Sequence, residues 1–504
     1  MSFITVISKL DVGIEPADIF YSLKGYKYLS FLDSSLEKSK YSKYSYIGWD
    51  PAFALESYGF RNSFYNLRSG IKVDSYQHPL NFLGENIEKF SNQESQENVY
   101  MARGNKLRKV KNSDSLPDFL GGFVGFFSYD LKNYIEKLPD TVADDYNMPL
   151  IYLAYFNRII AFNHRQNSWF YIRNFCQDRR LKLFFFGEDS VSVNVADKII
   201  EKINSEKSTL VFKKEKQSLK KVRQPVNSKL VSNFRKEDYI NAVSRAKEYI
   251  HNGDIYQVNI SQRFNIELNI DPAGFYTILR QKNSAPFSAF IGNPKFSIAS
   301  SSPERFLYIK RGDIETRPIK GTRPRGKNKR EDNRYARELK SSLKDRAELN
   351  MIVDLERNDL GKICYYGSVK VAEHAKIEKY AKVIHSVSTV VGKIKENVGF
   401  AEIIKATFPG GSITGAPKIR AMEIIDELEP TARSVYTGSI GYIGINGTAD
   451  LNIAIRTIIN IGNNYYYNVG GGIVEDSNPG EEYKETLDKG IALKQALEYF
   501  FKYG

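Results

Sequence analysis

Cysteines and long apolar runs are scarce in this chain of 504 residues, and each scarcity excludes a class of protein. Two cysteines, Cys176 and Cys364, are too few for a cysteine-rich metal framework, and so low a number is typical of a reducing compartment. The most apolar run, Phe119–Phe127, is far shorter than the roughly 20 residues of a membrane span. The first residues, MSFITVISKLDVG, show neither a charged leading segment nor a long apolar core, so no signal peptide is expected. We therefore expect a cytoplasmic protein with no membrane partner.

Positive charge is in excess, with a formal net charge of +14 at pH 7. Such a balance is typical of proteins that bind nucleic acid or an anionic substrate. The lysines are scattered, apart from one cluster near residues 206–230, and no zinc-finger spacing or RNA-binding aromatic signature occurs. We therefore expect no nucleic-acid partner, and an anionic substrate stays open.

The sequence divides into two regions and a polar linker. Residues 1–200 contain short aromatic and β-branched segments broken by Gly, Pro, Asn and Asp, a pattern typical of strands. Residues 201–232 are rich in Lys and Ser and poor in large apolar residues, which predicts a linker. In residues 233–504 helical and strand patterns alternate irregularly, and neighbouring strands look hairpin-linked. This organisation predicts an α+β fold rather than a doubly wound sheet.

Two predicted helices each carry a pair of carboxylates three residues apart, which places each pair on one helix face. The pairs are Asp345 with Glu348 and Glu482 with Glu485, and Asn478 is expected to cap the second helix. Two such faces that meet would supply the oxygen ligands that Mg²⁺ prefers. Acidic pairs at this spacing are common on exposed helices, so spacing alone favours solvated faces. The first helix is predicted to bury the stripe Leu343, Ala347, Met351 and Leu355.

Two glycine-rich segments could bring backbone close to an anion. In FPGGSITGAPK, residues 408–418, a loop runs into a predicted helix whose first N–H groups would attract a phosphate or a carboxylate. It is not a Walker A loop, because Gly415 is followed by Ala-Pro rather than by Lys-Ser/Thr. The second segment is Gly470, Gly471 and Gly472, after a predicted strand. A structural turn and a bulge are the alternatives for the two segments.

Lys320 and His385 are candidate reactive side chains. Lys320 lies between Arg317 and Arg323, and neighbouring cations would lower its pKa and make the amine a nucleophile. The alternative is a loop lysine in water, which is the commoner case. His385, in the apolar segment KVIHSVSTVV, could transfer protons or orient a carboxylate, or could be a core histidine with its hydrogen bonds satisfied.

Taken together, these segments resemble the chorismate-utilising enzymes. The matching motifs follow the family order over residues 235–500: GDIYQVNISQRF, SSSPERFL, RPIKGTRPRG, KDRAELNMIVDLERNDLG, HSVSTVVG, GGSITGAPKIRAMEIIDELEP, YTGSIGYIG, LNIAIRT and GGGIVEDSNPGEEYKETLDK. FLDSS, YSYIGWDP and GGFVGFFSYDL resemble the non-catalytic half of the large subunits of anthranilate and aminodeoxychorismate synthases.

Within the family, two features are similar to the aminodeoxychorismate synthase branch. They are PIKGT around Lys320, where anthranilate synthases typically have alanine in place of the lysine, and NSAPFSAF at residues 283–290. Gln257 stands where isochorismate and salicylate synthases usually have a lysine base, which argues against water as the nucleophile.

The resemblance implies a fold of two stacked antiparallel β-sheets flanked by helices, with both halves of the chain contributing. It implies conversion of chorismate and ammonia to 4-amino-4-deoxychorismate on the para-aminobenzoate route to folate, with Mg²⁺ as cofactor. No Gly-x-Cys-x-Gly segment is present, so a separate glutamine amidotransferase subunit is the expected ammonia source. Tryptophan is a possible ligand near Ser34 and Ser35, and anthranilate synthase component I is the alternative function.

The resemblance also assigns expected roles to residues. Lys320 would attack C2 of chorismate and expel the C4 hydroxyl, Glu304 would be the general acid, and His385 a further catalytic residue. The expected magnesium ligands are Glu348, Glu482 and Glu485, with Asp345 as a weaker candidate. The expected substrate-binding residues are Gln257, Thr322, Thr414, Tyr436, Arg456, Gly470, Gly471 and Gly472.

Overall fold

The computed structural model describes residues 3–36, 39–91, 98–103, 106–110, 116–178, 229–380 and 383–502. Most of the linker predicted at residues 201–232 therefore lies outside the described residues. Within the described ranges, no helix is both long and apolar enough to cross a membrane.

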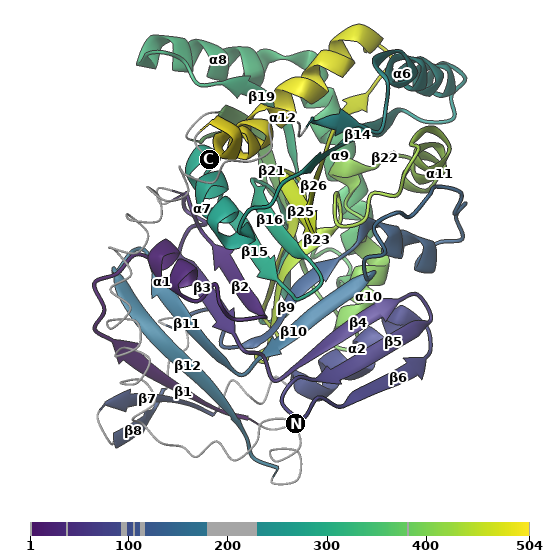
Figure 1. The fold of residues 1–504 in the computed structure, drawn as a ribbon. Helices are drawn as coiled ribbons and strands as arrows, with labels where there is room; N and C mark the ends of the chain where they lie inside the picture. The colour runs from purple at the N-terminus through teal and green to yellow at the C-terminus, as the bar shows by residue number, and fades with distance from the viewer. Residues whose placement is uncertain are drawn as a thin grey trace.

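The described strands form two large sheets (Figure 1). The first has 14 strands, in the spatial order β13 (Val231–Ser232), β14 (Gln257–Glu267), β26 (Asn464–Ile473), β25 (Thr457–Ile461), β16 (Ser297–Ser302), β15 (Phe287–Gly292), β2 (Leu29–Asp33), β3 (Tyr44–Trp49), β11 (Arg158–Asn163), β12 (Ser168–Cys176), β1 (Phe3–Leu10), β7 (Val99–Arg103) and β8 (Lys106–Lys109), with β22 (Gly415–Ala416) paired to β14. The second has 12 strands, in the order β19 (Ile319–Pro324), β21 (Val383–Lys393), β18 (Asp313–Arg317), β17 (Arg305–Lys310), β24 (Ala449–Ile453), β23 (Ser439–Gly444), β9 (Gly122–Phe127), β10 (Ile151–Phe156), β4 (Phe53–Tyr58), β5 (Arg61–Asn66) and β6 (Lys72–Tyr76), with β20 (Lys370–Lys379) paired to β21. Both sheets are antiparallel except where β1 pairs with β7.

The N-terminal and C-terminal regions share both sheets. Strand β2 pairs with β15, so that Leu32 lies opposite Ala289, and β9 pairs with β23, so that Gly125 lies opposite Gly441. The apolar faces of the two sheets enclose a core rich in aromatic side chains, including the stacked Phe53 and Tyr155. The predicted α+β class and the two-sheet architecture are confirmed, whereas the boundaries predicted near residues 200 and 232 stay a prediction.

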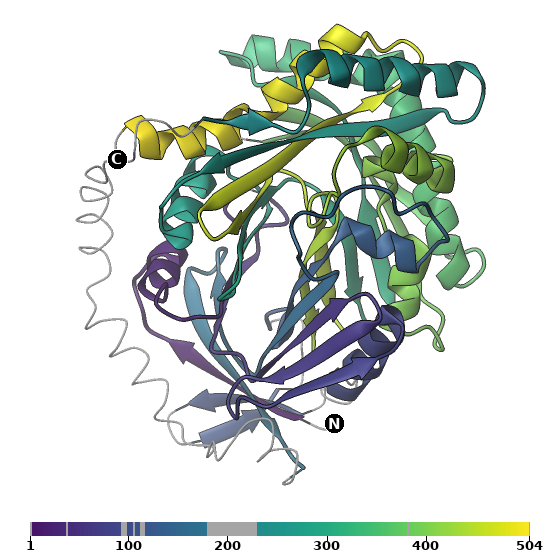
Figure 2. The ribbon, with the colours of Figure 1, turned by 45° about the vertical axis from the view of Figure 1, so that its right-hand side comes forward.

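Helices cover the outside of the sheets, and three of them lie together at one end of the molecule. They are α1 (Pro16–Ser22), α2 (Pro79–Phe90), α6 (Lys236–His251), α7 (Pro272–Lys282), α8 (Lys329–Ser341), α9 (Leu343–Ile363), α10 (Phe400–Thr407), α11 (Lys418–Leu428) and α12 (Pro479–Lys502), with 3-10 turns η3 (Tyr129–Tyr134) and η5 (Gly411–Ile413). Figures 1 and 2 show α6, α8 and α12 together at the end where β14 and β26 pair.

Two predictions about single helices can be compared with the structure: the cap of α12 and the buried stripe of α9. Asn478 caps α12 as predicted, since its Oδ1 accepts the N–H groups of Gly480 and Glu481 at 3.0 and 3.1 Å. The stripe predicted for α9 was wrong: Leu343 is 79% exposed. The helix instead buries Leu349, Ile352, Val353, Glu356, Asp359, Leu360 and Ile363. Apolar residues occur on more than one face of α9, and the face that packs on β19, β21 and α10 is the buried one.

Candidate active site

A β-bulge positions Lys320 on strand β19. Lys320 lies opposite Ser386 of β21 and Thr322 lies opposite His385, so Gly321 is the extra residue between them. Its φ of +75° suits glycine, and a Cβ at this position would lie 2.7 Å from the side chain of Leu339. The bulge thereby sets Thr322 beside His385, and Thr322 Oγ1 and His385 Nδ1 are 2.8 Å apart.

The amine of Lys320 is partly enclosed. Its Nζ donates to the Ser412 carbonyl at 3.0 Å. Burial lowers the pKa of Lys320, and the carboxylates of Glu348 and Glu304 only partly oppose that shift. The predicted cause was different: Arg317 and Arg323 are ion-paired, at 2.8 Å to Glu378 and 2.9 Å to Asp345 respectively. An amine that loses its proton more easily than an exposed lysine is a competent nucleophile.

Glu304 lies next to this amine and holds a proton near neutral pH. Its side chain is buried, and its Oε1 accepts the Ile319 N–H at 3.2 Å. Burial raises the pKa of Glu304 to about 7, against the lowering effects of the Ser412 side chain, the Ile319 N–H and Lys320. A carboxyl group with this pKa is suited to donate a proton to a leaving group.

Glu356 is a buried carboxylate that the sequence analysis missed. Its two oxygens accept the Gly411 N–H at 3.0 Å and the Thr316 hydroxyl at 3.3 Å. Burial raises its pKa to about 7, although Lys418 lowers it. Because Gly411 precedes Ser412, Glu356 anchors the turn whose Ser412 contacts both Lys320 and Glu304. No signal in the sequence marked Glu356, because the buried face of α9 is set by its contacts with β19, β21 and α10.

His385 is buried and neutral. Burial, followed by the charge of Arg456, lowers the pKa of His385 to about 3, against a backbone hydrogen bond with Gly321 that raises it. Its ring packs edge-on against Tyr380 at 5.3 Å between centroids. A histidine in this state can orient a partner by hydrogen bonding, and it holds no proton to donate as an imidazolium at neutral pH.

The three predicted glycines form part of the site wall. The pairing of β26 with β14 is regular through them, so the alternative of a bulge was wrong. A Cβ on Gly472 would lie 2.2 Å from Gln257 Nε2 and 3.6 Å from Lys320 Nζ. A Cβ on Gly471 would lie 3.1 Å from Glu482 Oε2 and 3.9 Å from Glu485 Oε1. Polar side chains therefore lie close to the backbone of β26 on both faces of the strand.

Of the four predicted magnesium ligands, Glu348 and Glu482 form no ion pair within the described part of the chain, whereas Asp345 and Glu485 are each paired with a cation. Burial raises the pKa of Glu348, with Lys320 and Lys344 opposing and Asp345 and Glu482 adding to the rise. Burial likewise raises the pKa of Glu482, which accepts the Ser477 hydroxyl at 2.6 Å and is also affected by Glu485.

Asp345 is held by Arg323 at 2.9 Å, and Glu485 by Lys489 at 2.7 Å. Lys489 also donates to the Gly470 carbonyl at 3.0 Å and is a further residue missed from the sequence. Among the described residues, no three His, Cys, Asp or Glu side chains are gathered closely enough to hold a metal ion. The donor chemistry of Glu348, Glu482 and Glu485 nevertheless fits Mg²⁺. A cation would stabilise the ionised forms of Glu348 and Glu482, which burial and, to a smaller extent, the neighbouring carboxylates disfavour.

Arg456 is a half-buried guanidinium with no ion pair or side-chain hydrogen bond within the described part of the chain. Burial lowers the pKa of Arg456, and only Tyr436 opposes the shift. By contrast, Arg305 and Arg433 are buried against Asp450 and Glu429 at 2.8 and 2.7 Å. A desolvated guanidinium without a protein anion is suited to bind a carboxylate from outside.

The structure therefore brings most of the predicted residues into two connected groups. The first contains Lys320, Glu304, Gln257, Glu348, Glu482, Glu485 and the three glycines. The second contains His385, Thr322, Arg456 and Tyr436. Thr414 lies in the buried turn after Ser412, and its hydroxyl donates to the Gly410 carbonyl at 3.0 Å.

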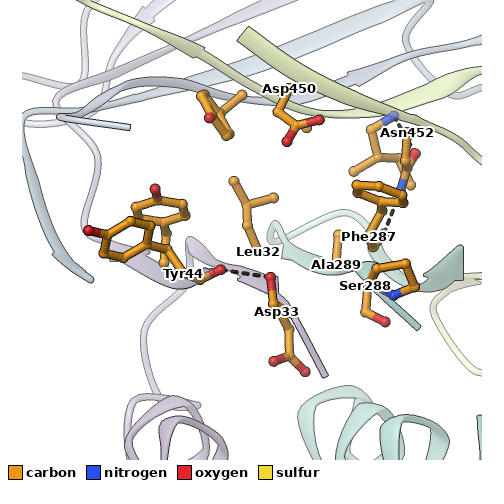
Figure 3. A pocket seen from close by; sticks show the side chains of 14 residues that line it. Leu32, Asp33, Tyr44, Phe287, Ser288, Ala289, Asp450 and Asn452 are labelled. Carbon is orange, nitrogen blue, oxygen red and sulfur yellow. Dashed lines mark hydrogen bonds between the residues drawn. The ribbon is translucent and has the colours of Figure 1, made fainter. Parts of the chain in front are cut away.

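A separate cavity lies between the two sheets. Its wall includes Asp33, Ser34, Tyr44, Phe287 and Asn452, and Figure 3 shows most of these side chains around it. None of the predicted catalytic, metal-binding or substrate-binding residues lines it. Ser34, one of the two serines expected near a tryptophan, is part of its wall, whereas Ser35 donates to the Ala285 carbonyl at 3.0 Å.

Comparisons with known proteins point to one family. A family model described as chorismate binding enzyme matches residues 50–495. Aminodeoxychorismate synthase component 1 of Bacillus subtilis (strain 168) is 40% identical over 393 residues, 78% of this chain and 80% of that protein. Anthranilate synthase component 1 of Acetivibrio thermocellus is 35% identical over 471 residues, 93% of this chain and 90% of that protein. The solved structure of anthranilate synthase component I from Streptococcus pneumoniae TIGR4 has a TM-score of 0.69 and 29% identity, covering 90% and 92% of the two chains.

Proposed function

The chain belongs to the chorismate binding enzymes, and from that premise we propose that it is an aminodeoxychorismate synthase component I. It converts chorismate and ammonia to 4-amino-4-deoxychorismate, in the synthesis of para-aminobenzoate for folate. The observation that carries the proposal is the amine of Lys320, which is partly enclosed, lowered in pKa and adjacent to the proton donor Glu304.

The first half of the reaction uses both of these groups. The lone pair of Lys320 Nζ forms a bond to C2 of chorismate, the two ring double bonds shift, and the C4–O bond breaks. Glu304 gives its proton to the departing hydroxyl, which leaves as water. Hydroxide alone is a poor leaving group, so a carboxyl group with a pKa of about 7 is well matched to this step.

The second half reverses the electron flow. The lone pair of ammonia forms a bond to C4, the double bonds shift back, and the bond between C2 and Lys320 Nζ breaks, so that the lysine recovers its amine. The carboxylate of Glu304 takes the surplus proton of the new ammonium group. An alanine in place of Lys320 would instead leave room for ammonia to reach C2, which is the outcome in anthranilate synthesis.

The remaining groups bind and orient the substrate dianion. Arg456, with Tyr436 beside it, would bind one carboxylate, and the backbone of Gly470, Gly471 and Gly472 would approach the other. Neutral His385, held by Thr322, orients a substrate oxygen, and the buried turn containing Thr414 closes the site.

Glu348, Glu482 and Glu485 are the residues that would hold Mg²⁺, after Glu485 is released from Lys489. The ion would neutralise the negative charge of the ring carboxylate. Asp345 is ion-paired with Arg323 and would not be a direct ligand of the ion while that pair is intact.

We also propose that a glutamine amidotransferase subunit supplies the ammonia, since the related proteins are named as component 1 of their enzymes. For the cavity beside Ser34, we propose tryptophan as the ligand, on the resemblance of the N-terminal region. Calorimetry with tryptophan and with a Ser34→Leu variant would test this second assignment.

The alternative function is anthranilate synthase component I, favoured by the relative that covers 93% of this chain. Purified protein incubated with chorismate, Mg²⁺ and an ammonium salt separates the two. Para-aminobenzoate formed only after addition of aminodeoxychorismate lyase supports the proposal, and fluorescent anthranilate contradicts it.

A further inference from the structure

Three polar side chains, those of Gln257, Asn259 and Ser261, alternate along one face of β14. All are at least nine-tenths buried, with exposed fractions of 1%, 9% and 2%. Gln257 Oε1, Asn259 Oδ1 and Ser261 Oγ accept or donate no hydrogen bond among the residues that the structure describes. A buried oxygen without a partner is costly, so a row of three on one strand indicates a ligand that supplies hydrogen-bond donors.

The row begins beside the reactive amine. Asn259 lies opposite Gly472 and Ser261 lies opposite Gly470 in the antiparallel register. A Cβ on Gly472 would contact Gln257 Nε2 at 2.2 Å and Lys320 Nζ at 3.6 Å, and a Cβ on Gly470 would lie 3.0 Å from Asn259 Oδ1. The oxygens therefore lead along the strand, away from Lys320, on the face that Lys320 shares.

The row offers neutral acceptors and no net charge. Beside β14, on its side away from β26, Arg433 and Glu429 are paired at 2.7 Å, and they hold the strand by its backbone. Arg433 donates to the Asn259 carbonyl at 2.6 Å, and Glu429 accepts the Ser261 N–H at 2.7 Å. The carboxylates of Glu482 and Glu485 lie near Gly471, whose missing side chain would point to the opposite face of β26.

Neutral acceptors beside an amine suit a small, uncharged ligand with several N–H groups. Ammonia has three such donors, and its lone pair stays available while they are bound. An ammonium ion has no lone pair, and a site for it would be expected to include a carboxylate. We propose that Gln257, Asn259 and Ser261 form the ammonia-binding site of the enzyme.

This inference rests on the proposed function in one respect, namely that ammonia is the co-substrate. Bound in the row, ammonia directs its lone pair at C4 of the lysine adduct. The C–N bond forms, the bond between C2 and Lys320 Nζ breaks, and the surplus proton passes to the carboxylate of Glu304.

The test uses the full-length protein with saturating chorismate and Mg²⁺, and with ammonium sulfate varied at fixed pH. Asn259→Leu removes an acceptor at similar volume, and Ser261→Ala removes a hydroxyl. We expect the KM for ammonium to rise about tenfold in the first variant and about threefold in the second, as for the loss of one hydrogen bond. The KM for chorismate should change by less than about twofold. Ser168→Ala is the matched control, because it also removes a buried, unpartnered hydroxyl, on β12 in a distant part of the same sheet.

The outcomes separate this inference from the proposed function. An unchanged KM for ammonium in Ser261→Ala and in folded Asn259→Leu, with aminodeoxychorismate still formed, overturns the ammonia site alone. Equal increases in the KM for ammonium and for chorismate overturn it as well. A selective increase with anthranilate as the product supports the ammonia site and overturns the proposed function. If thermal unfolding shows that Asn259→Leu does not fold, Ser261→Ala decides the question.

Discussion

Replacing Glu304 by glutamine should slow the reaction and stabilise the protein. The loss of rate should become smaller as the pH rises, whereas the gain in stability should become larger. Glutamine keeps the size of the side chain and an oxygen that can accept the Ile319 N–H, but it has no proton to give to the departing hydroxyl. Loss of a general acid typically costs about 10²–10⁴ in rate. The wild-type rate should therefore fall about tenfold per pH unit above the Glu304 pKa of about 7, whereas the rate of Glu304→Gln should lack this limb.

The effect on stability follows from the same pKa. Burial raises the pKa of Glu304 from 4.5 to about 7, so the folded state disfavours the ionised carboxylate. Below pH 4.5 the group is protonated in both the folded and unfolded states and costs nothing. As the pH rises through 4.5 towards 7, the unfolded state ionises first, and the cost grows to about 3 kcal/mol, at 1.36 kcal/mol per pKa unit.

Urea denaturation at pH 5 and pH 8 measures this difference. Glu304→Gln should exceed the wild type in free energy of unfolding by up to about 3 kcal/mol at pH 8 and by much less at pH 5. Asp354→Asn is the control, because it makes the equivalent exchange on a carboxylate of α9 whose side chain is 72% exposed. A glutamine variant that is equally active, or that is destabilised more at pH 8 than at pH 5, would refute the reasoning.

Four further predictions test other parts of the structure. Lys320→Ala should abolish aminodeoxychorismate formation and yield some anthranilate, detected by its fluorescence; full aminodeoxychorismate activity in this variant would exclude a covalent role. Arg456→Met should raise the KM for chorismate about 10–100-fold, as expected for a charge-assisted hydrogen bond, and should not destabilise the protein. Arg433→Met leaves Glu429 unpaired and should lower the free energy of unfolding in urea by about 3–5 kcal/mol. Equal destabilisation of the two arginine variants would contradict the assignment of Arg456 to substrate binding and of Arg433 to a structural ion pair. Glu356→Gln retains an acceptor for the Gly411 N–H and should lower kcat about threefold. Glu356→Leu leaves that N–H unsatisfied and should lower kcat about thirtyfold. Equal kcat values for the two variants would show that the turn at Gly411 and Ser412 does not depend on this contact.

Much of the fold could be predicted from the sequence. The strands that look hairpin-linked predict the α+β class, and the order of the family motifs predicts the two stacked sheets. The cap of α12 was also predictable, since Asn478 followed by proline is a local signal. The buried face of α9 was not: Leu343 and Leu349 are both apolar, and only the contacts with β19, β21 and α10 decide between their faces. Local patterns specify an element, whereas tertiary packing specifies its orientation.

The candidate site shows the same division. Motifs identified Lys320 and Glu304, but the lowered pKa of Lys320 arises from burial, which adjacent arginines in the sequence do not reveal. Glu356 was missed because its partner Gly411 is far away in sequence, and Lys489 because its hydrogen bond to the Gly470 carbonyl depends on how α12 packs on β26. The bulge at Gly321, which sets Thr322 beside His385, depends on the register with β21 and is likewise invisible in the sequence.

The central claim is that Lys320 forms a covalent bond with the substrate, and mass spectrometry tests it most directly. The protein is incubated with chorismate and Mg²⁺ without ammonia, quenched rapidly, digested and analysed by peptide mass. The account predicts that the peptide containing Lys320 gains the mass of chorismate less water, that this gain disappears when ammonium is added, and that Lys320→Ala never shows it. An unmodified Lys320 peptide from protein that still forms aminodeoxychorismate with ammonia would contradict the claim.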